Sequence, residues 1–140
     1  MNITLAELVW DRAHQCCEYC RLPQIYDEPP FEIDHVIAEQ HGGKTIAGNL
    51  ALACFADNHH KGPNLGGIDP QTGKRAWLFN PRRHKWDRHF RWDGPILLGR
   101  TAVGRATIAV LGINLAHRVR HRVQLIAEGV FPPEEPAESA

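Results

Sequence analysis

The sequence predicts a small α+β domain, and three observations lead to that prediction. The chain has 140 residues, the length of a single domain with a modest core. A helical pattern begins at Thr4, and another extends to Gly129. Between them, residues 31–37, FEIDHVI, have the alternation and β-branched content of a strand.

The first helix is predicted from its start signal. Thr4 and Glu7 have the spacing of a capping box, in which each side chain accepts a hydrogen bond from the backbone of the other residue. Apolar side chains then recur on one helix face, at Leu5, Leu8, Val9 and Ala13. We expect a short helix that leads into the first cysteines.

The middle of the chain follows from the strand at residues 31–37. A polar loop with a Gly-Gly break covers residues 39–49, and the apolar run LALACF comes next. A polar helix or turn is expected to begin near Asn58. Residues 62–74, GPNLGGIDPQTGK, have the composition of turns throughout.

Two helices are predicted in the C-terminal part. Residues 101–114 favour a helix although they contain Gly104 and Gly112. A second helix is predicted to start at an Asn114 cap and to stop at Gly129. Its apolar face is expected to contain Leu115, Val119, Val123 and Ile126.

These elements are assigned to three parts of the chain. Residues 1–74 are expected to form the core of the domain. Residues 75–129, a basic and aromatic segment followed by the C-terminal helices, are expected to pack on the same domain. The acidic tail, residues 130–140, is expected to be disordered.

The chain has no apolar run long enough to span a bilayer and does not begin like a signal peptide. We therefore expect a cytoplasmic protein without a membrane partner. Thiols stay reduced in that compartment, so spaced cysteines bind metal more often than they form disulfides.

The formal charge is zero, with 16 basic and 16 acidic residues, so the distribution of charge matters more than its sum. Residues 81–92, PRRHKWDRHFRW, form a basic and aromatic segment. Its cations could neutralise DNA phosphates without reading sequence: Arg82, Arg83, Lys85, Arg88 and Arg91. Its rings are expected to point inward: Trp86, Phe90 and Trp92.

Three cysteines have the pattern of a zinc-binding frame. Cys17 and Cys20 form a C-x-x-C pair, and Cys54 is followed three residues later by Asp57, where a second cysteine would complete the frame. Zinc accepts carboxylate oxygen as well as thiolate, so these four residues could hold a structural zinc ion. Cys16 is an alternative ligand with poorer spacing.

A second interpretation of the cysteines stays open. The three thiols could pack as small apolar groups without metal, and Asp57 could cap the following helix. A thioredoxin-like redox pair at Cys17 and Cys20 is disfavoured, because no βαβ pattern surrounds it.

Polar residues between the two halves of this frame suit phosphodiester hydrolysis. That reaction needs a base near neutral pH, which a histidine such as His35 provides. It also needs a hard divalent cation, for which Asp34 and the Asn58 amide oxygen could be ligands. Adjacent strand residues point to opposite faces, so Asp34 and His35 can serve one centre only if the strand ends or bends there.

Five pieces occur in order in the sequence: CEYC, IDHVI, GG, NLALAC and NHHKG. Over about residues 10–62 this order resembles the HNH endonuclease family, in the variant whose last signature histidine is asparagine. The resemblance implies a ββα-metal core with His35 as general base, Asn49 orienting it, and Asp34 and Asn58 holding one magnesium or manganese ion.

Neighbouring residues add further expectations. Lys61, three residues after Asn58, could contact a phosphate from the same helix face. His59 and His60 could be metal ligands or solvated side chains, and His89 is expected to be a packing histidine.

The predicted function is metal-dependent hydrolysis of DNA phosphodiester bonds, by a homodimer or a larger nuclease complex if not by a monomer. Two alternatives are a catalytically silent zinc-knuckle module that binds nucleic acid and a nuclease subunit active only with a partner.

Overall fold

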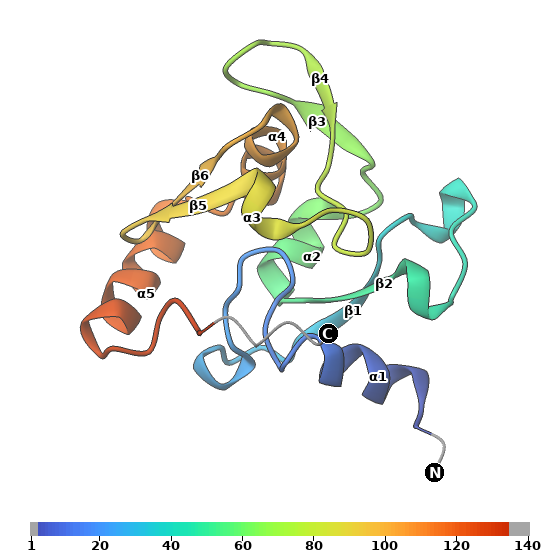
Figure 1. Ribbon diagram of the computed structural model, residues 1–140, viewed down its shortest axis with the longest axis horizontal. Coiled ribbons are helices and arrows are strands. Elements are labelled where there is room, and N and C mark those ends of the chain that lie inside the picture. The colour runs from blue at the N-terminus through green and yellow to red at the C-terminus, as the bar shows by residue number, and fades with distance from the viewer. Residues whose placement is uncertain (1–2, 135–140) are drawn as a thin grey trace.

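Three antiparallel two-stranded sheets and five α-helices make up residues 3–134, the part of the chain that the computed structural model describes (Figure 1). The helices are α1 (Leu5–Arg12), α2 (Phe55–Lys61), α3 (Trp86–His89), α4 (Ala102–Leu111) and α5 (Ala116–Ala127). The strand pairs are β1 (Glu32–His35) with β2 (Leu50–Ala53), β3 (Gly66–Ile68) with β4 (Arg75–Trp77), and β5 (Phe90–Asp93) with β6 (Ile96–Gly99). The α+β prediction is confirmed.

The N-terminal helix has the predicted start. The Thr4 hydroxyl accepts a hydrogen bond from the Glu7 backbone, and the Glu7 carboxylate accepts one from the Thr4 backbone. Val9 is fully buried and Ala13 nearly so, and α1 packs against β2. The capping box and the apolar face are both confirmed.

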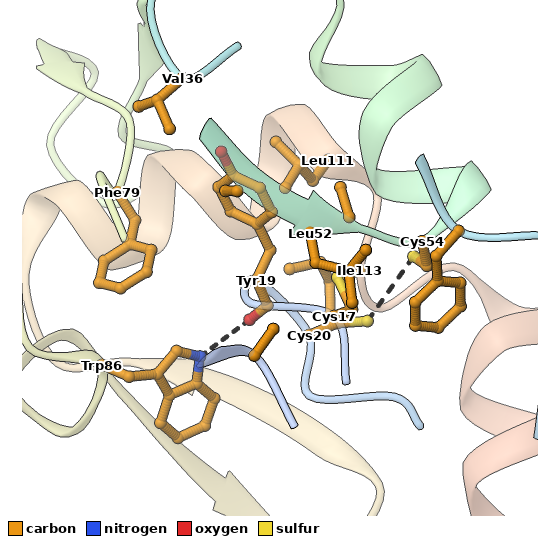
Figure 2. Packing of buried hydrophobic residues seen from close by; sticks show 14 of the residues in the cluster. Cys17, Tyr19, Cys20, Val36, Leu52, Cys54, Phe79, Trp86, Leu111 and Ile113 are labelled. Atoms are coloured by element: carbon orange, nitrogen blue, oxygen red, sulfur yellow. Dashed lines mark hydrogen bonds between the residues drawn. The ribbon is translucent and has the colours of Figure 1, made fainter. Parts of the chain in front are cut away.

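The core lies where three segments meet: the turn at residues 17–20, which we call the N-terminal knuckle, β2, and the start of β5. Figure 2 shows Tyr19 among these buried side chains, with the Trp86 indole donating a 2.8 Å hydrogen bond to the Tyr19 carbonyl oxygen. Trp86 and Phe90 are buried and Trp92 is half-buried, so the prediction that these rings point inward is confirmed.

Residues 62–74 contain more regular structure than their composition predicts. Gly66–Ile68 forms β3, which pairs with β4, whereas residues 62–63 and 70–72 are turns as predicted. Gly67 allows this pairing on top of α4, because a Cβ atom there would lie 2.4 Å from Val110 Cγ2. Figure 1 shows this hairpin and α4 together at one end of the molecule.

The prediction for the last helix is wrong in two respects. Asn114 does not cap α5; its side chain bonds the backbone of Leu97 instead. The predicted apolar face is partly solvent-exposed, at Leu115 and Val123, and the helix buries Arg118, Arg122 and Leu125.

Helices α2 and α4 agree more closely with the prediction. α2 begins at Phe55, three residues before the predicted start at Asn58. α4 runs through Gly104 and ends before Gly112, which has a positive φ. Phe131 is buried against Trp92, although disorder was expected from residue 130 onwards. Residues 135–140 of that predicted tail lie outside the described part of the chain.

Candidate active site and metal-binding cluster

The predicted catalytic residues lie on two strands and a helix that are consecutive in the chain, with Asn49 directly before β2. β1 pairs with β2 so that Asp34 lies opposite Ala51 and His35 opposite Leu50. α2 follows directly after β2 and packs against β1. The strand β1 ends at His35. The Asp34 side chain is buried, whereas the His35 ring reaches solvent, so the two neighbouring side chains have different surroundings.

Asp34 lies in the interior between a phenol and an ammonium group. Its Oδ2 atom accepts a 2.8 Å hydrogen bond from the Tyr19 hydroxyl and is 3.1 Å from Lys61 Nζ. Burial raises the pKa of this carboxyl group, and the positive charge of Lys61 acts in the opposite direction. The aspartate therefore depends on Lys61 to remain charged.

Lys61 is a structural cation in this fold. Its side chain is only 2% exposed, and Nζ also donates a 3.3 Å hydrogen bond to the His35 carbonyl oxygen. The expectation that Lys61 contacts a phosphate required a position on the surface. The structure instead places Lys61 where it ties the end of α2 to the end of β1.

His35 reaches solvent at the edge of this unit, with 28% of its side chain exposed. Its Nε2 atom is 2.8 Å from Thr45 Oγ1 and 3.3 Å from Glu39 Oε1. Both partners belong to the loop between β1 and β2.

Asn49 does not touch the His35 ring; it fixes the loop that contacts the ring. Its Oδ1 atom accepts a bond from the Ile37 N–H, and its Nδ2 atom donates to the carbonyl oxygens of Ile37 and Lys44. Lys44 precedes Thr45, the partner of His35. Gly43 is required beside this clamp, because a Cβ atom there would lie 1.7 Å from the Ile37 carbonyl oxygen.

Asn58 is half-buried on α2, one turn before Lys61. Of the two adjacent histidines, His59 pairs with Glu32 at 2.9 Å and stacks on Phe55. His60 bonds the Ala56 carbonyl oxygen within its own helix. Both rings have protein partners at the surface.

A second cluster lies at the other end of α2. One ligand atom from each of Cys17, Cys20, Cys54 and Asp57 lies within 4.8 Å of the others, and all four residues are buried. Figure 2 shows the cysteine sulfur atoms gathered beside the core, with Cys20 and Cys54 separated by 3.8 Å. Cys16 is not part of this group. The four residues could hold a metal ion.

Asp57 connects the cluster to the C-terminal helix α5. One carboxylate oxygen lies 3.1 Å from the Cys17 sulfur, and the other accepts a 2.7 Å bond from Arg118. Burial raises the pKa of Asp57 to about 7, while the charge of Arg118 lowers it. Asp57 does not cap α2, because the residue in the capping position is Cys54, whose sulfur accepts from the Asp57 N–H.

Comparison with models of known protein families matches the part of this arrangement that lies before α5. Residues 17–64 match the family model of the HNH endonuclease. The matched stretch contains the cysteine pair, β1, the glycine loop, β2 and α2. The chain therefore contains a match to an HNH endonuclease domain over these residues. Neither the curated proteins nor the solved structures that were compared gave a match.

At the family level, the HNH match supports nuclease activity, and it confirms the resemblance drawn from the sequence. The matched HNH domain is about a third of the 140-residue chain. The structure also contains no helix, among residues 3–134, with the length and hydrophobicity needed to cross a bilayer.

The basic segment at residues 81–92 lies outside the HNH match. One of its cations is ion-paired, and the others are exposed. Arg82 forms an ion pair with Glu18 and is largely buried. The other four basic side chains are exposed: Arg83, Lys85, Arg88 and Arg91. His89 is held by Thr101 and by the Phe79 ring, as expected of a packing histidine.

Four residues of this region were missed by reasoning from the sequence: Tyr19, Glu39, Thr45 and Arg118. Glu39 carried a weak signal, since it follows His35 by four residues in a loop of the HNH pattern. Tyr19 and Arg118 carried none, because their partners Asp34 and Asp57 are distant in the sequence.

Proposed function

We propose that this protein is an endonuclease that hydrolyses DNA phosphodiester bonds with a divalent cation. The observation that carries the proposal is the position of His35, which is partly exposed at the end of β1 and next in the chain to Asp34. In this proposal the His35 ring removes a proton from the attacking water. Glu39 and Thr45 hold the ring in position.

The cation would be magnesium or manganese, because the donors are a carboxylate from Asp34 and an amide oxygen from Asn58. When bound, such an ion stabilises negative charge on the phosphate and on the leaving oxygen. Lys61 neutralises the same carboxylate in the described structure, so cation and Lys61 would share Asp34. Arg83, Lys85 and Arg88 would contact phosphates beyond the site, whereas Arg82 is held by Glu18.

The test is relaxation of supercoiled plasmid with magnesium or manganese. Wild-type protein should relax the plasmid only when a divalent cation is added, and His35→Ala should abolish relaxation. His14→Ala, at an exposed histidine outside the site, is the matched control and should keep activity. Absence of relaxation by folded wild-type protein with both metals would refute the hydrolytic function and favour a binding module or a partner-dependent subunit.

We also propose that the Cys17, Cys20, Cys54 and Asp57 cluster holds a structural zinc ion. Two thiolates on a tetrahedral zinc at about 2.3 Å lie roughly 3.8 Å apart, and Cys20 and Cys54 have that separation. The ion would take no part in hydrolysis. Its role would be to join the N-terminal knuckle to the start of α2.

Adjacent cysteines provide the matched pair for testing zinc. Purified wild-type protein and Cys16→Ser should each contain about one zinc per chain, because Cys16 lies outside the cluster. Cys17→Ser should lose most of the zinc and unfold at a lower temperature. Mass spectrometry measures the zinc content of each variant. Equal zinc in Cys16→Ser and Cys17→Ser would refute this ligand set.

A further inference from the structure

Trp77 is an exposed aromatic residue that the proposed chemistry does not use. Its side chain lies on β4 and is 70% exposed, which is unusual for a ring of this size. It takes part in no ring contact among residues 3–134. Gly66 lies directly opposite Trp77 on β3, so no cross-strand side chain covers the ring.

The hairpin presents Trp77 on its outer face. Gly67 and Ala76 belong to the alternate set of positions, and Gly67 is in contact with α4. Arg75 and Trp77 are two residues apart on the same strand, so they share the other face, and both are exposed. A cation thus lies beside the free ring.

Two hollows meet at Trp77 and lead from the hairpin towards the active site. The outer one, of about 720 Å³, lies along the hairpin and includes Arg75. The inner one, of about 430 Å³, reaches Arg83 and Val36, the residue that follows His35. Both are lined by His41 and Trp77, so the two hollows are neighbours, and together we call them the Trp77 groove.

The charge of the Trp77 groove fits a polyanion. No aspartate or glutamate lines either hollow within the described part of the chain, whereas Arg75 and Arg83 do. A free ring flanked by arginines is the arrangement with which proteins bind single-stranded nucleic acid, by stacking on a base and neutralising its phosphates. Bases of an intact duplex are covered by their neighbours, so only an unpaired base could lie on the ring.

We propose that Trp77 stacks on an unpaired base of the strand that enters the HNH site, while Arg75 and Arg83 contact the adjacent phosphates. This inference rests on the proposed function and adds a substrate class to it. The favoured substrates are single-stranded or locally unpaired DNA rather than continuous duplex.

The test measures binding in a His35→Ala background, which prevents cleavage without a chelator that could remove zinc. A labelled single strand of mixed sequence and its blunt duplex are titrated by fluorescence anisotropy. Trp77→Ala should raise the single-strand Kd about 10-fold and change the duplex Kd less than about 2-fold. Trp77→Phe should restore much of the single-strand affinity.

The matched control is Ile25→Ala, because Ile25 is 82% exposed and lines neither hollow. This variant should bind both DNA forms like its parent. Circular dichroism of every variant confirms that the fold is retained.

Three results would overturn the inference. The first is an equal single-strand Kd with and without Trp77, and the second is an equal loss of affinity for single strand and duplex in Trp77→Ala. The third is Trp77-dependent binding of polyglutamate that is as tight as the binding of DNA. The last would assign the groove to an acidic protein segment. Plasmid relaxation without a Trp77 effect on binding would refute this inference alone. Trp77-dependent binding by a wild-type protein that never cleaves would refute the proposed hydrolysis alone.

Discussion

At the residue scale, the buried pair of Asp34 and Lys61 has two roles that compete. Lys61 keeps the carboxylate charged in the interior and fixes the end of α2 to β1. The same carboxylate is the proposed ligand of the catalytic cation. Neutralisation by Lys61 in the absence of DNA and metal would explain how an acidic ligand is tolerated at a buried position.

This pair gives a double-mutant prediction. Lys61→Met leaves the Asp34 charge buried without its cation and should reduce the free energy of unfolding by about 3–5 kcal/mol. Adding Asp34→Asn should recover part of that loss, since the uncompensated charge is then gone. Urea denaturation of the two single variants and the double variant measures the coupling; strictly additive losses would show that the two side chains act independently.

At the element scale, the β3–β4 hairpin is anchored to α4 by one bidentate ion pair. Asp69 accepts 2.9 Å bonds from Nε and Nη2 of Arg105, and it also accepts from Gln71 and Thr72 in the turn. The Arg105 hydrogen bonds lower the pKa of Asp69 below its ordinary value of 3.8. The anchor therefore holds the hairpin that presents Trp77.

The lowered pKa sets the pH window of this anchor. Its contribution to stability is complete above about pH 4, the unfolded-state value, and is lost as the pH falls further towards the folded-state value. Asp69→Asn should therefore lower the melting temperature at pH 7, and the difference from wild type should shrink below pH 4. Asp11→Asn, on the exposed side of α1, is the control. A constant difference between pH 7 and pH 3 would contradict this role.

Elements with local signals were predictable from the sequence, and α5 shows why others were not. The capping box of α1 and the strand at β1 depend on neighbouring residues alone. In α5, Arg118 and Arg122 are buried because they donate to the carbonyl oxygens of Leu111 and Ile113 near the end of α4. Leu111 ends α4 and Ile113 lies just beyond it, so neither carbonyl oxygen has a partner within that helix, and no hydrophobic pattern can reveal that need.

For the proposed active site, the sequence indicated candidate residues but not the contacts that they make. The order of motifs located His35, Asn49 and Asn58 in the chain, since the spacing of that pattern is kept in the sequence. The burial of Lys61 was not predictable, because a lysine near a helix end is solvated unless a distant carboxylate such as Asp34 receives it.

At the scale of the whole molecule, Arg118 connects the C-terminal extension to the HNH domain through Asp57. Arg118→Met leaves the Asp57 carboxylate buried without a cation and should reduce the free energy of unfolding by about 3–5 kcal/mol. Asp57→Cys removes the carboxylate oxygen that accepts from Arg118, so the loss caused by Arg118→Met should be smaller in that background by about 1 kcal/mol or more. Chemical denaturation with a zinc-release readout measures both effects.

The outcome separates two descriptions of the extension. A smaller loss in the Asp57→Cys background means that α5 is coupled to the proposed metal-binding cluster through the contact between Arg118 and Asp57. The same loss in both backgrounds would mean that Arg118 stabilises the fold only through the Leu111 carbonyl oxygen.

The separation of Asp57 and Arg118 along the chain also bears on synthesis at the ribosome. The two residues are 61 positions apart, so at about 5–20 residues per second the arginine is made roughly 3–12 s after the aspartate. During that interval every other side chain of the cluster has already been made. A nascent chain that captures zinc early would hold Asp57 without its counter-charge, and docking of α5 would be the last step of maturation.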